Sequence, residues 1–213
     1  MSELFAITSL SMTTTAAYLL GAIPLAQQIS SWHGVDIFST GTRLAGSTNV
    51  RLSVGKFPAL IVLIGDISKG GAAVLMAKYF GVSDPWLLFP ILAVVIGHWK
   101  SIFSHFRGGD GLATLGGATV AAFPVLGIIS VLVAMVVALG AQRLPYPSLL
   151  SLVLGYAILA SLIIIYGGNW ILVVGIGCLS GLVLANAFNG HRLRNRYADL
   201  HAIEMDISGF LDS

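Results

Sequence analysis

A glycine-rich stretch at residues 106–111 combines residue types that could bind an anion. It reads Phe-Arg-Gly-Gly-Asp-Gly, with glycine at 108, 109 and 111. At the start of a helix, the backbone amides of Gly108 and Gly109 could donate to a phosphate or an oxyanion, and Arg107 could add a positive charge. Alone the stretch is a weak signal, because glycine-rich turns between helices are common.

A long connection precedes this stretch, at residues 30–56. Its 27 residues contain Gly34, Gly41, Gly46 and Gly55. A loop of this length in a compact domain is usually functional or disordered, and we expect it to be functional.

Asp66 and Lys69 lie three residues apart within an apolar run. This spacing places both on one helix face, and charges in an apolar environment are costly unless they pair. We expect a structural ion pair that faces the helix bundle rather than a catalytic pair.

The composition identifies an integral membrane protein. Of 213 residues, 56% are hydrophobic and only 9% are charged, and the mean hydropathy is +0.91. In soluble domains about a quarter of the residues are charged. A net charge of +2 gives no basic surface for nucleic acid, which we exclude as a partner. We expect residues 1–213 to form a single membrane domain.

Six apolar runs provide candidate membrane segments: 4–29, 57–80, 86–99, 112–139, 148–166 and 170–187. The fourth holds Pro124 near its middle, so it is either one kinked helix or two short crossings. One crossing divides the Lys and Arg residues evenly between the two sides of the membrane. Two crossings, seven in total, leave nine on one side, Lys78 on the other and Lys69 within the membrane. Positive charges collect on the cytoplasmic side, so we predict about seven helices, with the N-terminus outside and the C-terminus cytoplasmic.

Six motifs occur in order along the chain and together resemble the bacterial acyl-phosphate:glycerol-3-phosphate acyltransferase family. They are Tyr-Leu-Leu-Gly-Ala-Ile-Pro at 18–24, Gly-Val-Asp-Ile at 34–37, Gly-Ser-Thr-Asn-Val at 46–50, Asp-Ile-Ser-Lys-Gly at 66–70, Gly-His at 97–98 and Phe-Arg-Gly-Gly-Asp-Gly-Leu-Ala-Thr at 106–114. The resemblance extends from about residue 18 to about residue 196. It implies a seven-helix enzyme of the bacterial cytoplasmic membrane.

The resemblance also implies the reaction. The family transfers a fatty acyl group from acyl phosphate to the 1-hydroxyl of glycerol 3-phosphate and produces lysophosphatidic acid for phospholipid synthesis. Its implied partners are these two substrates and membrane lipid, with no metal and no cofactor. The chemistry needs donors for the developing oxyanion, cations for two phosphates and an apolar groove for the chain.

Carried over residue by residue, the resemblance gives three groups of site residues. Those expected around the donor and the oxyanion are Thr42, Gly46, Thr48, Asn49, Ser148 and the amides of Gly108 and Gly109. Those expected to bind phosphate are Arg43, Arg51 and Arg107. Those expected near the acceptor hydroxyl, as general base or for positioning, are Asn186 and His191.

Several of these residues also have an ordinary structural interpretation. Gly46, Thr48 and Asn49 could cap a loop, and Thr42 and Ser148 could be hydroxyls at helix starts. Arg107 could only determine topology, and His191 could be an interfacial anchor. These alternatives stay open at the level of sequence.

The chain departs from the family pattern at its cations. The family arginine three residues after the motif asparagine, here Asn49, corresponds to Leu52. The family lysine of Gly-Gly-Lys-Gly corresponds to Asp110, and a family asparagine corresponds to Leu44. A carboxylate in place of a phosphate-binding lysine reverses the local charge. The alternative hypothesis is therefore a non-catalytic or differently tasked member, such as a structural subunit with partners in a membrane complex.

His105 and Asp110 have the His-x4-Asp spacing of the acyl-CoA-dependent glycerolipid acyltransferases. His201 and Asp206 in the polar tail have the same spacing, which shows that it arises by coincidence. We therefore give the His105–Asp110 spacing no weight.

Overall fold

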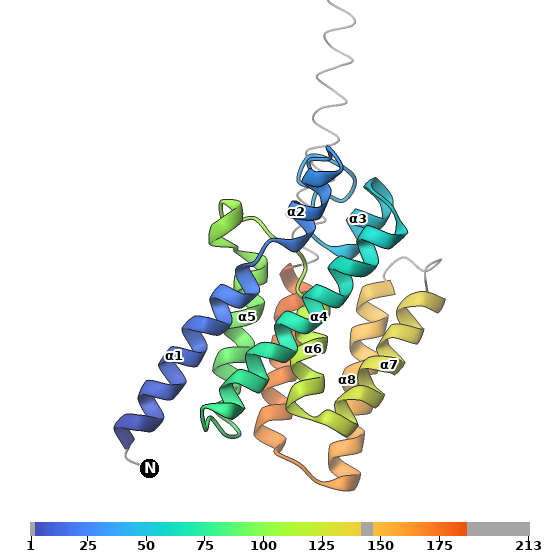
Figure 1. Ribbon diagram of the computed structural model, residues 1–213. Helices are drawn as coiled ribbons and strands as arrows, with labels where there is room; N and C mark the ends of the chain where they lie inside the picture. Colours follow the sequence, from blue (N-terminus) through green and yellow to red (C-terminus); the bar gives the residue numbers. More distant parts are fainter. Residues whose placement is uncertain (1–2, 142–146, 187–213) are drawn as a thin grey trace, which may run out of the picture.

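The structure is a computed structural model that describes residues 3–141 and 147–186 (Figure 1). The described residues are helical and contain no β-strand, so the all-α prediction is confirmed. The helices are α1 (Glu3–Ala22), α2 (Leu25–Trp32), α3 (Ser47–Ser53), α4 (Lys56–Tyr79), α5 (Leu88–Trp99), a 3-10 turn (Ile102–Ser104), α6 (Leu112–Ala122), α7 (Pro124–Gly140), α8 (Pro147–Tyr166) and a further helix at Trp170–Asn186.

Each predicted apolar run contains helix. Three described helical segments are long and apolar enough to cross a membrane: Glu3–Trp32, Lys56–Tyr79 and Ser148–Tyr166. Shorter apolar helices account for the remaining runs. The run at 112–139 is divided at Phe123, and α7 begins at Pro124, where a proline costs a helix no hydrogen bond. The total of seven crossings and the orientation of the termini stay predictions.

The first apolar run is not one continuous helix, which corrects the prediction of a single segment at 4–29. Helix α1 ends at Ala22, and α2 begins at Leu25 after Pro24. Proline has no N–H to continue the hydrogen-bond ladder, and it disfavours helical geometry in the residue before it. The break leaves backbone carbonyls at the end of α1 without helical partners.

Lys69 of α4 satisfies two of the carbonyls at this break. Its Nζ donates to the carbonyls of Gly21 at 3.3 Å and Ile23 at 3.0 Å. A positive charge at the C-terminal end of a helix is also favoured by the helix dipole. The predicted pairing with Asp66 is confirmed, with 2.8 Å between Lys69 Nζ and Asp66 Oδ1. Both side chains are buried, and the Lys69 hydrogen bonds join the interrupted first segment to α4.

Small residues allow the helices to approach closely around this pair. A Cβ at Gly21 of α1 would collide with the backbone of Val94 of α5, and a Cβ at Gly70 of α4 would collide with the backbone of Thr114 of α6. In Figure 1, α4 lies between the α1–α5 pair and α6, while α7 and α8 form a hairpin at the side. Close backbone packing is expected to hold helices together in lipid, because lipid provides no hydrophobic driving force between them.

This arrangement predicts the consequences of removing the acid. Asp66→Ala leaves the buried Lys69 ammonium without its counterion, and breaking a buried pair costs about 3–5 kcal/mol. Asp66→Asn keeps a hydrogen-bond acceptor and should destabilise less. Melting temperatures in detergent should therefore fall in the order wild type, Asp66→Asn, Asp66→Ala. Asp84→Ala removes an exposed carboxylate and serves as the control. Equal melting temperatures for all four proteins would contradict the prediction.

Candidate active site

A groove of about 730 Å³ runs between helices α4, α6, α7, α8 and Trp170–Asn186. Its inner wall is mainly apolar. The hydroxyls there bond within their own helices: Thr119 Oγ1 donates to the carbonyl of Leu115, and Ser130 Oγ donates to the carbonyl of Leu126. Ligand pockets of this volume and character hold molecules with long apolar parts. Its apolar lining includes Leu60, Leu63, Ile67, Leu115, Val131, Ala134, Met135, Leu152, Leu159 and Ile176.

One end of the groove is polar. Helices α4, α6 and α8 all begin at the same end of the bundle, the upper end in Figure 1. The lining residues at or near these helix starts and on α3 carry hydroxyls and charges: Ser47, Thr48, Arg51, Lys56, Asp110 and Ser148. We call this set the groove mouth. It combines hydrogen-bond donors, two cations and one carboxylate beside an apolar channel.

The two cations of the groove mouth are not neutralised by protein carboxylates. Among the described residues, no Asp or Glu oxygen lies within 4.0 Å of the charged nitrogens of Arg51 or Lys56. Lys56 is moreover the first residue of α4, where the helix dipole disfavours a cation. Lys56 therefore gains no stabilisation from the helix dipole, and among the described residues no carboxylate occupies its ammonium group, which leaves it available to a negatively charged ligand.

The glycine-rich turn is fixed by backbone contacts. The amide of Gly109 donates to the carbonyl of His98 at 3.1 Å, and the amide of Ala45 donates to the carbonyl of Gly108 at 3.1 Å. A Cβ at Gly108 would collide with the backbone of His98, and a Cβ at Gly109 would collide with the His98 ring and the backbone of Ala45, so the glycines permit this contact. In this structure the hydrogen of the Gly109 amide is bound to the carbonyl of His98, and donation of this amide to an anion stays a prediction.

Asp110 is held at both of its polar groups. Its carbonyl accepts a hydrogen bond from Trp99 Nε1 at 2.6 Å, and its Oδ1 accepts one from the amide of Leu112 at 3.1 Å. The latter bond satisfies an amide in the first turn of α6 and places a negative charge at the favoured end of that helix. Where the resemblance predicts a phosphate-binding lysine, this chain has a capping carboxylate.

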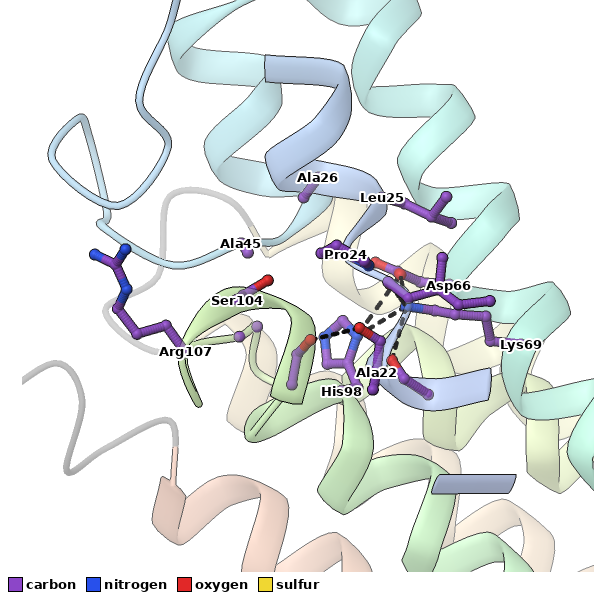
Figure 2. A pocket seen from close by; sticks show the side chains of 15 residues that line it. Ala22, Pro24, Leu25, Ala26, Ala45, Asp66, Lys69, His98, Ser104 and Arg107 are labelled. Carbon is purple, nitrogen blue, oxygen red and sulfur yellow. Dashed lines mark hydrogen bonds and ion pairs between the residues drawn. The ribbon is translucent and has the colours of Figure 1, made fainter. Parts of the chain in front are cut away.

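A second, much smaller polar cavity lies on the other side of the turn (Figure 2). Asp66, Lys69 and His98 meet there, with His98 Nδ1 at 3.6 Å from Asp66 Oδ1 and 3.4 Å from Lys69 Nζ. Arg107 borders the cavity, but Figure 2 shows its guanidinium directed away from this cluster. The Arg107 guanidinium lies 4.3 Å from the centroid of the Phe38 ring. The cluster joins α1, α4 and α5 and is enclosed, which favours a structural role.

Asn49 organises the long connection at 30–56. Its Nδ2 donates to the carbonyls of Ile37 at 2.9 Å, Thr40 at 3.0 Å and Leu44 at 3.0 Å. Its Oδ1 accepts from the amide of Thr42 at 3.0 Å and from a serine hydroxyl. The side chain is buried and its hydrogen-bonding capacity is filled. These contacts favour the loop-organising alternative for Asn49, and its contact with the donor stays a prediction.

The predicted site residues thus separate into groups. Thr48, Arg51 and Ser148 meet in the groove mouth, whereas Arg107, Gly108 and Gly109 border the small cavity. The other described site residues line neither space, namely Thr42, Arg43, Gly46 and Asn49 in the loop and its flanking helix α3, and Asn186 at the end of the last described helix. His191 lies outside the described residues.

Several polar residues of these two spaces are absent from the predicted site, among them Ser47, Lys56, His98 and Asp110. A lysine that opens an apolar span, at the unfavourable end of a helix and next to a functional loop, is a signal that could have indicated Lys56. His98 stood within a recognised motif, but its contact with Asp66 and Lys69 depends on the packing of α5 against α4 and could not be read from spacing.

A model of the glycerol-3-phosphate acyltransferase family matches residues 11–196 of the chain. The chain belongs to this family. Among its curated relatives, glycerol-3-phosphate acyltransferase 1 of Deinococcus radiodurans is 44% identical over 130 residues, which cover 58% of this chain and 66% of that protein. Glycerol-3-phosphate acyltransferase of Thermus thermophilus is 43% identical over 117 residues, which cover 54% of this chain and 58% of that protein. Both alignments span less than two thirds of the relative's length.

The family likeness extends to the fold. The crystal structure of PlsY (YgiH), an integral membrane glycerol 3-phosphate acyltransferase, in its glycerol 3-phosphate form matches with a TM-score of 0.75 and 30% sequence identity. The match covers 88% of this chain and 92% of that chain. The lysophosphatidic acid form of the same protein matches with a TM-score of 0.72. The predicted all-α integral membrane fold is therefore confirmed.

The loop organised by Asn49 generates a second prediction. Asn49→Asp keeps the shape of the side chain but cannot donate to the three loop carbonyls, each such bond contributing about 1 kcal/mol. Amides at residues 37–44 should exchange with deuterium about tenfold faster or more, because the loop opens more easily. Thr48→Ala, at the exposed neighbouring position, is the control. Unchanged exchange at 37–44 in the Asp variant would refute the organising role.

Proposed function

We propose that the protein is an acyltransferase of the bacterial cytoplasmic membrane that moves a fatty acyl group from acyl phosphate to glycerol 3-phosphate and releases lysophosphatidic acid. The observation that carries the proposal is the groove, whose apolar channel opens at a mouth with two cations that the described carboxylates do not neutralise. An amphipathic substrate with a phosphate beside a long chain matches this shape and charge. The glycerol 3-phosphate and lysophosphatidic acid forms of PlsY support the choice of acceptor and product.

The proposal gives each part of the groove a role. The acyl chain lies along the channel, where each buried methylene contributes about 0.8 kcal/mol. Arg51 and Lys56 bind phosphate, and the hydroxyls of Thr48 and Ser148 donate to phosphate or to the acyl carbonyl oxygen. Asn186, half-buried at the end of its helix, and His191 are retained as the proposed acceptor-side residues. No step requires a metal or a cofactor.

The direct test is transfer by the purified protein. With palmitoyl phosphate and labelled glycerol 3-phosphate in detergent micelles, labelled lysophosphatidic acid should form in proportion to enzyme. The Thermus thermophilus relative in the same assay controls for substrate quality. Absence of product from this protein, with product from the relative, would reject the proposal. A partner that copurifies in fixed stoichiometry would then favour the alternative of a structural subunit.

A third prediction concerns Lys56. Lys56→Gln removes a charge from the groove mouth, and charge-assisted hydrogen bonds contribute about 1.5–3 kcal/mol. The Michaelis constant for the phosphate-bearing substrate that occupies the mouth should rise about tenfold or more, while kcat changes less. Lys100→Gln removes an exposed lysine that is not among the groove residues and should leave both constants unchanged. Equal effects of the two substitutions would contradict a phosphate at Lys56.

A fourth prediction concerns the width of the channel. Gly116 of α6 lines the groove, and a Cβ there meets only Val131 methyl groups, at 3.8 Å and 3.9 Å. Gly116→Leu should therefore be tolerated by the helix but should occupy space that a long chain needs. Activity should shift from palmitoyl phosphate toward shorter acyl phosphates. Gly181→Leu, on an exposed helix position outside the groove, is the matched control. An unchanged preference for acyl-chain length in Gly116→Leu would contradict the binding of the acyl chain beside Gly116.

A further inference from the structure

One hydroxyl inside the groove has no partner in the described part of the protein. The serine hydroxyls along the channel donate to carbonyls of their own helices, as Ser151 does to Ser148 at 3.0 Å and Ser180 to Ile176 at 2.8 Å. Tyr156 of α8 also lines the groove, but its hydroxyl forms no hydrogen bond with any described residue. A tyrosine hydroxyl that is withdrawn from water usually has a partner. This one is therefore available to a ligand in the groove.

A notch in the helix at Trp170–Asn186 fixes the position of this hydroxyl. A Cβ at Gly177 would collide with the Tyr156 hydroxyl and with the ring atoms next to it, so the end of the phenol lies directly against the Gly177 backbone. The oxygen is not sealed in by this contact. The fully enclosed, unpartnered side-chain oxygens of the described residues belong to Thr14, Ser30 and Thr114, and Tyr156 is not among them.

The Tyr156 side chain belongs to the channel rather than to the groove mouth. Tyr156 follows Ser148 of the mouth by eight residues of α8, which is about 12 Å along the helix axis. With bonds of about 1.5 Å, an extended acyl chain whose carbonyl carbon lies in the mouth has about its tenth carbon at this depth. The Tyr156 hydroxyl therefore meets the middle of the chain, far from the reacting carbonyl and from either phosphate.

The channel wall around Tyr156 is otherwise apolar. Leu152 and Leu159 flank Tyr156 on the face of α8 that lines the groove, and Ile176 precedes Gly177 on the facing helix. A plain alkyl chain at this depth excludes water and gives the phenol no acceptor, and an unpaired polar group in such surroundings is unfavourable. A chain that carries an oxygen at the same depth would accept the phenol hydrogen instead.

We propose that Tyr156 makes the protein prefer acyl phosphates that carry a hydroxyl near the middle of the chain, an inference that rests on the proposed function. The phenol donates its hydrogen to the substrate hydroxyl. The transfer reaction is the same for both kinds of chain, because the hydroxyl is remote from the reacting carbon. Plain chains remain substrates, but they leave the phenol without a partner.

Tyr156→Phe tests the proposal, because it removes the hydroxyl and keeps the ring. Each purified protein is assayed in detergent micelles with palmitoyl phosphate and with palmitoyl phosphate that bears a hydroxyl at about carbon ten. In the wild type the hydroxylated chain should have the larger kcat/KM. This preference should fall about fivefold in Tyr156→Phe, because one neutral hydrogen bond is lost.

Two controls isolate the contact. Palmitoyl phosphate with its hydroxyl on the carbon next to the carbonyl cannot reach Tyr156, so its kcat/KM relative to the plain chain should be equal in wild type and Tyr156→Phe. Tyr166→Phe is the matched variant, because Tyr166 is exposed at the end of α8 and is not among the groove residues. It should leave every ratio unchanged.

Stability supplies a readout that does not depend on activity. If the hydroxyl has no partner in the protein, Tyr156→Phe should melt at the wild-type temperature or above it. A fall of several degrees would show that the hydroxyl is bonded within the protein, and it would overturn the proposal.

The kinetic outcomes separate this inference from the proposed function. A wild type that transfers no acyl chain overturns both. An active wild type that treats the plain and the mid-chain hydroxylated substrate alike overturns the role of Tyr156 alone, as does a preference that survives in Tyr156→Phe. A loss of kcat/KM that is equal for all chains also overturns it, because Tyr156 would then only support the structure.

Discussion

The buried ammonium of Lys69 is the constraint on which the arrangement depends. A charge at this depth is tolerated only because Asp66 neutralises it and because Pro24 frees carbonyls of the first apolar segment to receive it. The interruption that would weaken an isolated helix is thereby converted into an attachment to α4. Helix α2 and the connection that follows begin from this attached point.

The same cluster is linked to the chemistry through α5. His98 contacts both members of the ion pair, and its carbonyl accepts the amide of Gly109. Its neighbour Trp99 donates to the carbonyl of Asp110. The position of the groove mouth thus follows from the position of the polar core, because one short turn belongs to both. The long connection at 30–56 and the start of α6 are both hydrogen-bonded to this turn or to α5. The lining groups of the mouth can therefore be positioned before any substrate binds.

The sequence predicts the parts of this structure that depend on composition and local chemistry. Apolar length predicts the helical runs, Pro124 predicts the division between α6 and α7, and the cost of lone charges in lipid predicts the Asp66–Lys69 pair. Pro24 also indicates a break in the first apolar run. The stabilisation of that break, however, depends on Lys69, which lies 45 positions later in the chain.

The site is predicted only in part for the same reason. Arg51, Thr48 and Ser148 lie in the groove mouth, as expected for site residues. The Asn49 side-chain amide and the Gly109 backbone amide instead donate to backbone carbonyls. Packing between segments distant in sequence decides whether a side-chain or backbone amide within a motif faces a ligand or a neighbouring carbonyl. Lys56 and Asp110 bring opposite charges to the groove mouth, and spacing alone could not show that they share one groove.

An experimental structure with a non-hydrolysable acyl phosphonate bound tests most directly whether this groove is the donor site. The predicted result is a phosphonate group within hydrogen-bond distance of Arg51 and Lys56, with the acyl chain of the ligand between α4, α6 and α8. A phosphonate bound instead in the small cavity beside Lys69 and His98, with the groove empty of chain, would contradict the account.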